Sequence, residues 1–338
     1  MQFLSLFTTL LHFLPSEISH SLALKGLNLC YRIGLIDFLS KNERHHSGNL
    51  ENNFEQKDEF LGKFSNPLGI AAGLDKNGDY IDSLAALGVG FIEIGTVTPR
   101  SQEGNDKPRL FRDKKNLALV NRMGFNNKGL EYLINNVKNR KSKIPLGISI
   151  GKNFDTPIEE AYLDYLECLD KVYPYADYLA VNISSQNTTN LRALSSKEYL
   201  NDLLGKLKKL QKEKSKKYNY RPIFIKISPD ETKETILDIC NSVKEISIDG
   251  LICTNTSLNH DGNFGAGGIS GAPLMKSSTE VLSQVRSIMG ESFPIIATGG
   301  VLSAQDYKAK IQAGANLVQI YTGFIYKGPK LIQDIFEV

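Results

Sequence analysis

The fold is decided by the stretch PIFIKIS (222–228), TKETILDICNSVKEI (232–246) and GLICTN (250–255). A short apolar run is followed by a segment whose apolar residues recur about every 3.6 positions, and a second apolar run closes the unit. Apolar strands that alternate with amphipathic helices are typical of a parallel sheet covered by helices. The stretch therefore predicts a strand–helix–strand unit of the α/β class.

The same unit recurs in both directions along the chain. The eight apolar runs are LGIAAG (68–73), GFIEIG (90–95), PLGISIG (145–151), YLAVNIS (178–184), PIFIKIS (222–228), GLICTN (250–255), PIIATGG (294–300) and NLVQIYTG (316–323). Further helical patterns lie at 129–140, 158–172, 198–214, 278–289 and 304–314. Eight units predict a closed (β/α)8 TIM barrel. An open doubly wound sheet is the alternative, but it requires a G-x-G-x-x-G turn that GIAAGLDKNG (69–78) does not supply.

Composition places the chain among soluble globular proteins. Of its 338 residues, 41% are hydrophobic and 23% are charged, which excludes a disordered chain and a polytopic membrane protein. The net charge of +3 gives no reason to expect a nucleic acid as partner. The four cysteines form no C-x-x-C pair, so neither a disulfide framework nor a metal site is expected.

Residues 1–40 are expected to form a small helical hairpin. MQFLSLFTTLLHFL (1–14) has helical spacing and ends at Pro15, and a second helical pattern runs from Ile18 to Tyr31. The first run lacks the basic start of a secretory signal and is shorter than the about 20 residues that span a membrane. From this segment alone, ordinary packing on the main domain is favoured; the alternative is that the apolar face rests in a membrane interface or accepts an apolar ligand. The polar residues 41–65 predict a linker or surface hairpin, and residues 66–338 the barrel.

In such a barrel the chemistry lies at the carboxyl ends of the strands. Here those ends carry amides, hydroxyls, glycines and two lysines, Lys76 and Lys226. Sparse acidic residues and the lack of a histidine cluster argue against a paired-carboxylate glycosidase and a metal hydrolase. Gly299–Gly300 and Thr322–Gly323 favour a phosphate-bearing ligand. Lys226 either forms a Schiff base, as in an aldolase, or holds a charge on a cofactor ring.

Several long motifs make the chain resemble one family. They are NPLGIAAGLDKNG (66–78), IEIGTVTPR (92–100), GNDKPRLFR (104–112), NRMGFNN (121–127), GKN (151–153), NISSQNT (182–188), IKISPD (225–230), TNT (254–256), GGISG (267–271), GG (299–300) and LVQIYTGFIYKGP (317–329). In order and spacing they resemble class 2 dihydroorotate dehydrogenase, the FMN-dependent, quinone-reducing enzyme of pyrimidine synthesis. The resemblance extends to the pattern P-x-x-x-x-H at Pro15–His20.

The resemblance implies a reaction and a catalytic base. Enzymes of this family oxidise dihydroorotate to orotate, with FMN as hydride acceptor and a membrane quinone as final electron acceptor, in UMP biosynthesis. The second serine of the NISS motif is the family's base, which is Ser185 here, and it would take a proton from C5 while C6 delivers hydride to the flavin. A serine is a weak base and needs help from neighbouring groups or a water chain. Class 1 enzymes have a cysteine at this position, so Ser185 indicates the quinone-linked class.

The resemblance also implies binding residues. Substrate contacts fall on Lys76, Asn121, Arg122, Met123, Gly124, Phe125, Asn182, Asn187, Asn255 and Thr256. Contacts to one FMN per subunit fall on Ala72, Gly73, Leu74, Asp75, Lys76, Thr96, Ser149, Asn182, Lys226, Thr254, Gly271, Gly300, Tyr321 and Thr322. The quinone tunnel falls on His20, Arg112 and Tyr321. Lys226 would lie near the pyrimidine edge of the flavin and stabilise its anionic reduced form.

The resemblance implies a location, and two departures from the family's pattern affect the site. Peripheral association with the cytoplasmic face of a bacterial inner membrane is expected, without a nucleic acid or an obligatory protein partner. Gln186, Thr189 and Asn190 replace two prolines and a glycine in the closing loop, which predicts a more mobile loop and a modest effect on rate. Ser149 replaces an asparagine, and a hydroxyl keeps one flavin hydrogen bond of two.

Three rival readings stay open at this point. A class 1 enzyme would use fumarate or NAD as its electron acceptor. A barrel aldolase would work through Lys226, and a membrane-associated binding protein would keep only the fold.

Overall fold

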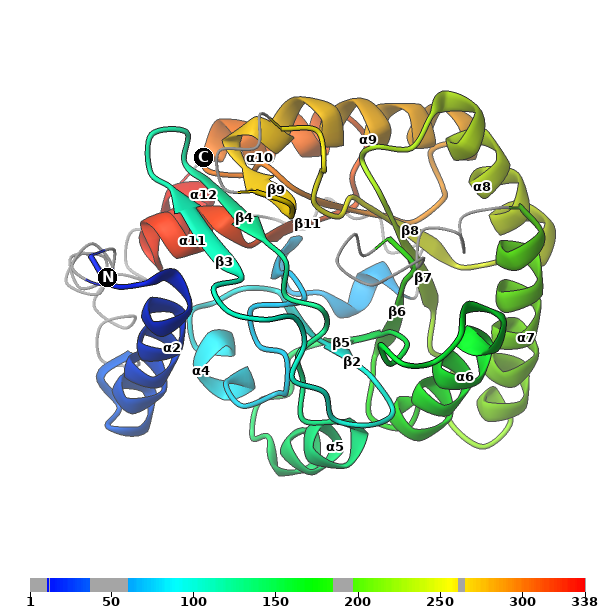
Figure 1. Ribbon diagram of the computed structural model, residues 1–338, viewed down its shortest axis with the longest axis horizontal. Helices are drawn as coiled ribbons and strands as arrows, with labels where there is room; N and C mark the ends of the chain where they lie inside the picture. The colour runs from blue at the N-terminus through cyan, green and yellow to red at the C-terminus, as the bar shows by residue number, and fades with distance from the viewer. Residues whose placement is uncertain (1–10, 12, 37–59, 185–196, 261–264, 338) are drawn as a thin grey trace.

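The computed structural model describes residues 11, 13–36, 60–184, 197–260 and 265–337. Within it, parallel strands close into a barrel in the order β1-β11-β10-β8-β7-β6-β5-β2 (Figure 1). These strands are β1 (Leu68–Ile70), β2 (Phe91–Val97), β5 (Leu146–Ile150), β6 (Tyr178–Asn182), β7 (Ile223–Ile227), β8 (Gly250–Cys253), β10 (Ile295–Thr298) and β11 (Leu317–Ile320). Each coincides with one predicted apolar run, and the predicted TIM barrel is confirmed.

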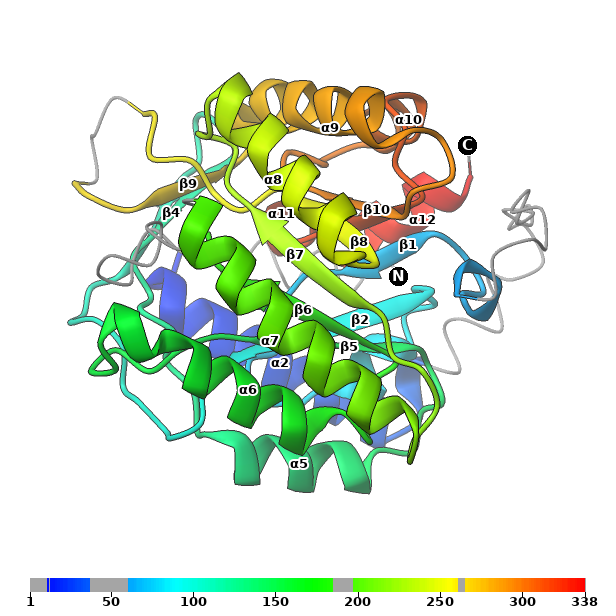
Figure 2. The same cartoon turned by 90° about the vertical axis from the view of Figure 1, so that its right-hand side faces the viewer.

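Helices cover the outside of the barrel. They are α4 (Ile81–Ala85), α5 (Leu130–Asn139), α6 (Ala161–Val172), α7 (Lys197–Ser215), α8 (Lys233–Ile246), α9 (Met275–Met289), α10 (Ala304–Gln312), α11 (Thr322–Lys327) and α12 (Lys330–Phe336). Figure 2 shows α6, α7 and α8 side by side along one flank. Thr232 caps α8 by accepting a hydrogen bond from the N–H of Thr235 at 3.2 Å. The helix predicted at 278–289 begins earlier, at Met275.

Aromatic side chains fill the barrel interior at the amino ends of the strands. Phe91, Tyr178 and Phe224 are fully buried in one cluster there. Glycine on a neighbouring strand makes room for the rings: a Cβ on Gly147 would lie 2.1 Å from Tyr178 Cζ, and one on Gly250 would lie 2.2 Å from Phe224 Cε1. Side chains therefore fill this end of the barrel, and a functional site is expected at the carboxyl ends of the strands.

Phe60 and Phe64 close the amino end of the barrel. The ring centroid of Phe60 lies 5.4 Å from that of Phe224, and the centroid of Phe64 lies 5.3 Å from that of Phe91. Both residues flank the short helix η1 (Leu61–Lys63) and belong to the range 41–65, for which a linker or surface hairpin is expected. They are buried because their rings cover the aromatic cluster, whereas residues 41–59 lie outside the described residues.

A three-stranded antiparallel sheet, which the sequence patterning does not predict, borders the barrel. Its order is β3 (Leu110–Asp113), β4 (Ala118–Asn121) and β9 (Gly268–Gly271), and β4 pairs with β9 through Leu119 and Ser270. The strands β3 (LFRD) and β9 (GISG) mix apolar residues with charged residues, a serine and glycines, so they lack the continuous apolar run by which the barrel strands are recognised. The sheet joins two segments that lie far apart in sequence. Asn121, at the end of β4, and Gly271, at the end of β9, therefore lie on neighbouring strands.

The N-terminal helix α2 (Ser16–Arg32) packs against α4 and β3 (Figure 1). Leu24 and Leu27 are buried against the barrel, whereas Ile18, Leu22 and Leu29 are exposed. The second helix of the predicted hairpin is thus present, and most of the first lies outside the described residues. In the described ranges, no helix combines the length and the apolar character needed to cross a membrane.

Candidate active site

A cavity opens at the carboxyl ends of the barrel strands, with β4 and β9 contributing to its wall. About 1030 Å³ of space lies between its walls, and this figure includes open solvent. The predicted site residues that line it are Ala72, Gly73, Lys76, Thr96, Asn121, Met123, Gly124, Phe125, Asn182, Lys226, Thr254, Asn255, Thr256, Gly271, Gly300, Tyr321 and Thr322. Residues scattered over most of the chain thus meet in one place.

Two predicted cofactor residues, Leu74 and Asp75, belong to the loop after β1 but do not line the cavity. Leu74 is buried, and its carbonyl oxygen lies 3.0 Å from His20 Nε2. The Asp75 carboxylate accepts hydrogen bonds from the N–H groups of Asp79 and Tyr80, at 2.9 and 2.7 Å. Burial raises the pKa of Asp75 to about 6. These residues shape the loop that presents Gly73 and Lys76.

Arg122 and Ser149 also lie outside the cavity lining. The Arg122 guanidinium lies over the Phe111 ring, 4.8 Å from its centroid, and donates to the carbonyl of Pro108. Ser149 is fully buried, and its Oγ lies 2.8 Å from Thr96 Oγ1. The predicted base Ser185, the predicted substrate residue Asn187 and the loop residues Gln186, Thr189 and Asn190 lie outside the described residues.

A chain of hydrogen bonds joins four strand ends in the cavity. Beyond the contact with Ser149, Thr96 Oγ1 accepts a hydrogen bond from Asn182 Nδ2 at 3.2 Å. Asn255 Nδ2 lies 3.4 Å from Asn182 Oδ1 and donates to Ser184 Oγ at 3.1 Å. Ser184 is fully buried and directly precedes the predicted base. The amides of Asn182 and Asn255 and the hydroxyl of Ser184 are therefore held in place.

Two lysines supply positive charge to the cavity, the buried Lys226 and the half-buried Lys76. Burial, reinforced by the positive charge of Arg109, lowers the pKa of Lys76 to about 8, while Glu17 acts in the opposite direction. Lys76 therefore still carries its proton at pH 7. Burial also lowers the pKa of Lys226, and the nearby Glu93 carboxylate opposes that shift.

Glu93, Tyr178 and Gln319 form a buried polar cluster inside the barrel. Glu93 Oε2 accepts hydrogen bonds from the Tyr178 hydroxyl and from Gln319 Nε2, each at 2.8 Å. Gln319 lines the cavity, as Lys226 does. The Oε1 atoms of Glu93 and Gln319 are buried and have no hydrogen-bond partner among the described residues. A carboxylate inside the barrel is thus electrostatically linked to a lysine on the cavity wall.

Glycine backbone forms the cavity wall at the ends of β10 and β11. Gly299 and Gly300 have φ values of 107° and 85°, which only glycine adopts readily. A Cβ on Gly300 would lie 2.3 Å from Met275 Cα at the start of α9, so no larger residue fits there. Thr322 completes this wall, with its Oγ1 2.8 Å from Ser270 Oγ. Bare N–H groups and hydroxyls at this end suit an anion.

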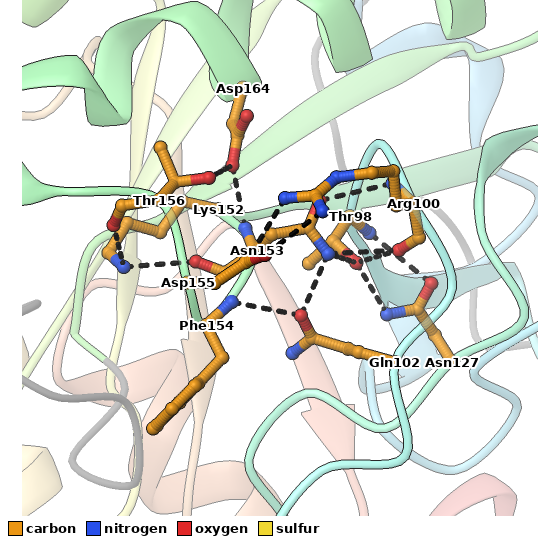
Figure 3. A network of polar contacts seen from close by, with 10 residues as sticks. All are labelled: Thr98, Arg100, Gln102, Asn127, Lys152, Asn153, Phe154, Asp155, Thr156 and Asp164. Carbon is orange, nitrogen blue, oxygen red and sulfur yellow. Dashed lines mark hydrogen bonds and ion pairs between the residues drawn. The ribbon is translucent and has the colours of Figure 1, made fainter.

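Asn127 and Asn153 hold the loop that carries Asn121–Phe125 (Figure 3). Asn127 Nδ2 donates to the Phe125 carbonyl at 2.7 Å and to Thr98 Oγ1 at 2.8 Å. Asn153 Nδ2 lies 3.1 Å from the same Thr98 oxygen and 2.8 Å from Gln102 Oε1. Phe125 has a φ of 53°, which is uncommon for a residue with a side chain, and the Asn127 bond fixes it. These two motif asparagines therefore set the shape of the cavity wall.

The three residues predicted for the quinone tunnel connect α2 with the cavity. His20 Nε2 bonds with the Leu74 carbonyl, and burial, with the positive charge of Lys76, lowers the pKa of His20 to about 4. Arg112 on β3 donates to Ser19 Oγ at 3.1 Å. Tyr321 lines the cavity, and its ring lies 3.4 Å from where a Cβ on Gly73 would be.

Sequence reasoning did not single out several lining residues, namely Ala71, Ser270, Leu274, Thr298, Val301 and Gln319. Thr298 and Gln319 lie on predicted strands, in which successive side chains point to opposite faces. This alternation could have identified them as residues that face the cavity. Ser270 lies on the unpredicted sheet. Among the described residues, no three His, Cys, Asp or Glu side chains are grouped to hold a metal ion.

Comparison with known proteins agrees with this geometry. The family described as Dihydroorotate dehydrogenase matches residues 57–338. A protein of Acinetobacter baylyi named Dihydroorotate dehydrogenase (quinone) is 48% identical over 337 residues, covering 98% of this chain and 97% of that protein. One of the same name from Shewanella denitrificans is 52% identical over 279 residues, covering 80% and 82%. The crystal structure of DHODH from Eimeria tenella with ferulenol matches with a TM-score of 0.80 at 31% identity, over 95% of this chain and 89% of that one. The chain therefore belongs to the dihydroorotate dehydrogenase family, among its quinone-dependent members.

Proposed function

We propose that this chain oxidises (S)-dihydroorotate to orotate, with FMN as hydride acceptor and a membrane quinone as final electron acceptor, in de novo pyrimidine biosynthesis. The observation that carries the proposal is the cavity, where two lysines, asparagine amides and bare glycine backbone meet. The relatives named Dihydroorotate dehydrogenase (quinone) support the same reaction.

The cavity residues fit FMN. The wall of Gly299, Gly300 and Thr322 offers backbone N–H groups and a hydroxyl to the phosphate. Lys226 offers an ammonium group to the electron-rich edge of a flat ring, and Gly73 leaves space for a ring beside Tyr321. When bound, FMN accepts the hydride from C6 and provides the route for electrons to quinone. Ser149 serves this site by holding Thr96, since its hydroxyl faces Thr96 and does not line the cavity.

The proton chemistry belongs to Ser185 and its surroundings. Lys76 pairs with the substrate carboxylate, and Asn121, Asn182 and Asn255 match the amide edges of the ring. Ser185 takes the C5 proton as the hydride leaves C6, so that a double bond forms between the two carbons. Ser184, which directly precedes Ser185 in the chain, accepts a hydrogen bond from Asn255. Proton abstraction by a weak base requires a ring that is held in a fixed orientation, and fixed amides provide this.

The exposed face of α2 supports peripheral membrane association. Ile18, Leu22, Leu29 and Ile33 are between 43% and 67% exposed and are spaced for one face of the helix. A contiguous apolar surface of this kind binds reversibly at a bilayer interface. Quinone dissolved in the membrane would then reach the cavity past His20 and Arg112, beneath the same helix.

The first experiment is anaerobic reduction of the purified chain. Addition of dihydroorotate should bleach the visible flavin band, and a quinone should restore it. A yellow protein that dihydroorotate leaves yellow would retain the cofactor assignment and contradict the substrate. A colourless protein that cannot be reconstituted with FMN, especially one whose Lys226 is trapped by borohydride with a carbonyl substrate, would overturn the proposal.

The base is tested by Ser185→Ala in the same assay. We expect flavin content and spectrum to be unchanged and the rate of bleaching to fall by about 10²-fold or more, the usual contribution of a general base. Ser283→Ala, at an exposed position of α9, is the control and should bleach at the wild-type rate. Equal rates in the two variants would remove Ser185 from the mechanism.

A further inference from the structure

Lys310 is a fully buried lysine on α10, outside the residues assigned above. Its Nζ donates to Ser278 Oγ at 2.6 Å. Ser278 is fully buried near the start of α9, and its Oγ lies 2.7 Å from the carbonyl oxygen of Leu274 and 3.0 Å from that of Gly299. Since Gly299 lines the cavity, Lys310 is separated from the cavity wall by one side chain and one peptide group.

The charge of Lys310 has no close counterpart in the described ranges. No described carboxylate forms an ion pair with it. Asp306, one turn earlier on α10, accepts hydrogen bonds from the Leu302 N–H and the Ser303 hydroxyl, at 3.0 and 2.8 Å. Burial lowers the pKa of Lys310 to about 8, although Cys253 and Asp306 act in the opposite direction. A buried ammonium group is costly unless an anion lies near it.

The end of the cavity next to Gly299 has no positively charged side chain among the described residues of its wall. Its walls, from Gly271, Gly299, Gly300, Val301, Thr322 and Gly323, offer N–H groups and hydroxyls but no cationic side chain. Lys76 enters the cavity from the loop after β1, and Lys226 enters from β7. A phosphate monoester carries a charge of about −2 at neutral pH. Such a group would find backbone donors at this end, and its nearest buried cation behind them would be Lys310.

We infer that Lys310 is the hidden counter-charge of the phosphate end, and that it makes the cavity prefer a phosphorylated flavin to the same flavin without its phosphate. It acts through the electrostatic field and through Ser278, which fixes the Gly299 peptide, so it is a positioning residue that does not touch the ligand. The inference deepens the proposed use of FMN and rests on it.

The test compares FMN with riboflavin, which has the same ring but no phosphate. The full chain, freed of flavin, is titrated with each flavin while the quenching of flavin fluorescence is followed. In Lys310→Met we expect the affinity for FMN to fall about tenfold or more and the affinity for riboflavin to stay close to wild type. Lys308→Met removes a lysine from the exposed side of the same helix and should leave both affinities unchanged.

The possible results separate this inference from the proposed cofactor. Equal losses for both flavins in Lys310→Met would assign a purely structural role to Lys310, and unchanged affinities would remove its role altogether. If the methionine variant does not fold, Lys310→Gln, which retains a donor for Ser278 without the charge, gives the same comparison. A wild-type chain that binds neither flavin would contradict the use of FMN itself.

Discussion

Glu17 on α2 and Arg109, just before β3, form an ion pair with Glu17 Oε1 2.8 Å from Arg109 Nη2. Arg109 is nearly buried and also donates to the carbonyl of Asn105 at 3.0 Å. Asn105 in turn packs on Gly124, where a Cβ would lie 2.8 Å from the Asn105 nitrogen. Gly124 lines the cavity. One ion pair thus connects the helix with the exposed apolar face to the wall of the site.

Glu17→Gln should weaken the packing of α2 against the barrel without changing ligand binding in the cavity. The pair is partly open to solvent, which limits the loss in the free energy of unfolding to about 1 kcal/mol. We expect a lower Tm and a higher KM for quinone, with the affinity for orotate unchanged. Glu167→Gln removes a carboxylate whose partner, Lys171, lies 3.0 Å away on the surface of α6 and should have no effect. Identical behaviour of the two variants would contradict a coupling role for Glu17.

Acid should weaken the docking of α2 through His20. Its folded pKa of about 4 lies below the ordinary 6.5, because burial disfavours the charged ring. The unfolded chain therefore binds the proton first, and stability falls as the pH drops from 6.5 toward 4, by at most about 3 kcal/mol. Denaturant unfolding across this window should show a smaller loss in His20→Gln than in the wild type. Parallel curves for the two proteins would exclude His20 as the titrating group.

The affinity for orotate should depend on whether Lys76 is protonated. Burial lowers its pKa to about 8, and a lysine that pairs with the ligand carboxylate must be charged. Orotate affinity in the wild type should therefore decline above pH 8, by up to about tenfold per pH unit. Lys76→Arg keeps its charge and should lose this decline, whatever its absolute affinity. Binding is the right readout, because the pH dependence of turnover would also contain that of the proton-abstraction step.

The apolar face of α2 should govern vesicle binding and quinone use together. Replacing Ile18, Leu29 and Ile33 by serine removes three of the four apolar side chains of the exposed face without touching Leu24 or Leu27 in the core. We expect weaker sedimentation with lipid vesicles and a higher KM for a long-chain quinone, with unchanged turnover of a water-soluble acceptor. Leu237→Ser is the control, since Leu237 is equally exposed but lies on α8. If vesicle binding survives in the triple variant, this face is not the anchor.

The parts of the fold that the sequence predicted have long, unambiguous patterns. Each barrel strand is a continuous apolar run, since both of its faces are buried, and the polar residues that follow must converge because parallel strands end at one edge. The β3-β4-β9 sheet has neither property, as β3 (LFRD) and β9 (GISG) are not continuous apolar runs and β9 lies far from β4 in sequence. Pairing at that distance leaves no signal in a local pattern of residues.

The sequence patterns also did not predict burial that arises from tertiary packing. Lys310 occurs in AQDYKAKIQAG (304–314), where a lysine in an amphipathic helix is ordinarily solvated, and only the packing of α10 beside α9 encloses it. Phe60 and Phe64 follow a polar segment and were therefore included in a surface region, whereas the open amino end of the barrel buries them. A pattern reports which face of one element is apolar, not what another element places on it.

Glu93→Gln should change the charge at the cavity without removing any cavity residue. Burial lowers the pKa of Lys226, and the Glu93 carboxylate is the group that opposes this shift. With a neutral amide at position 93, the pKa of Lys226 should fall further, so that the lysine loses its proton at a lower pH than in the wild type. The Tyr178 hydroxyl and Gln319 Nε2 retain an acceptor in the new amide oxygen, so the packing is preserved.

The visible spectrum of bound flavin provides the measurement, because it responds to a charge near the ring. The Glu93→Gln spectrum should titrate with pH at a lower midpoint than that of the wild type. In the double variant with Lys226→Met the transition should disappear, which identifies the titrating group as Lys226 and not the flavin or the protein at large. A transition that persists in the double variant, or a midpoint unmoved by Glu93→Gln, would mean that the carboxylate inside the barrel does not set the charge of Lys226.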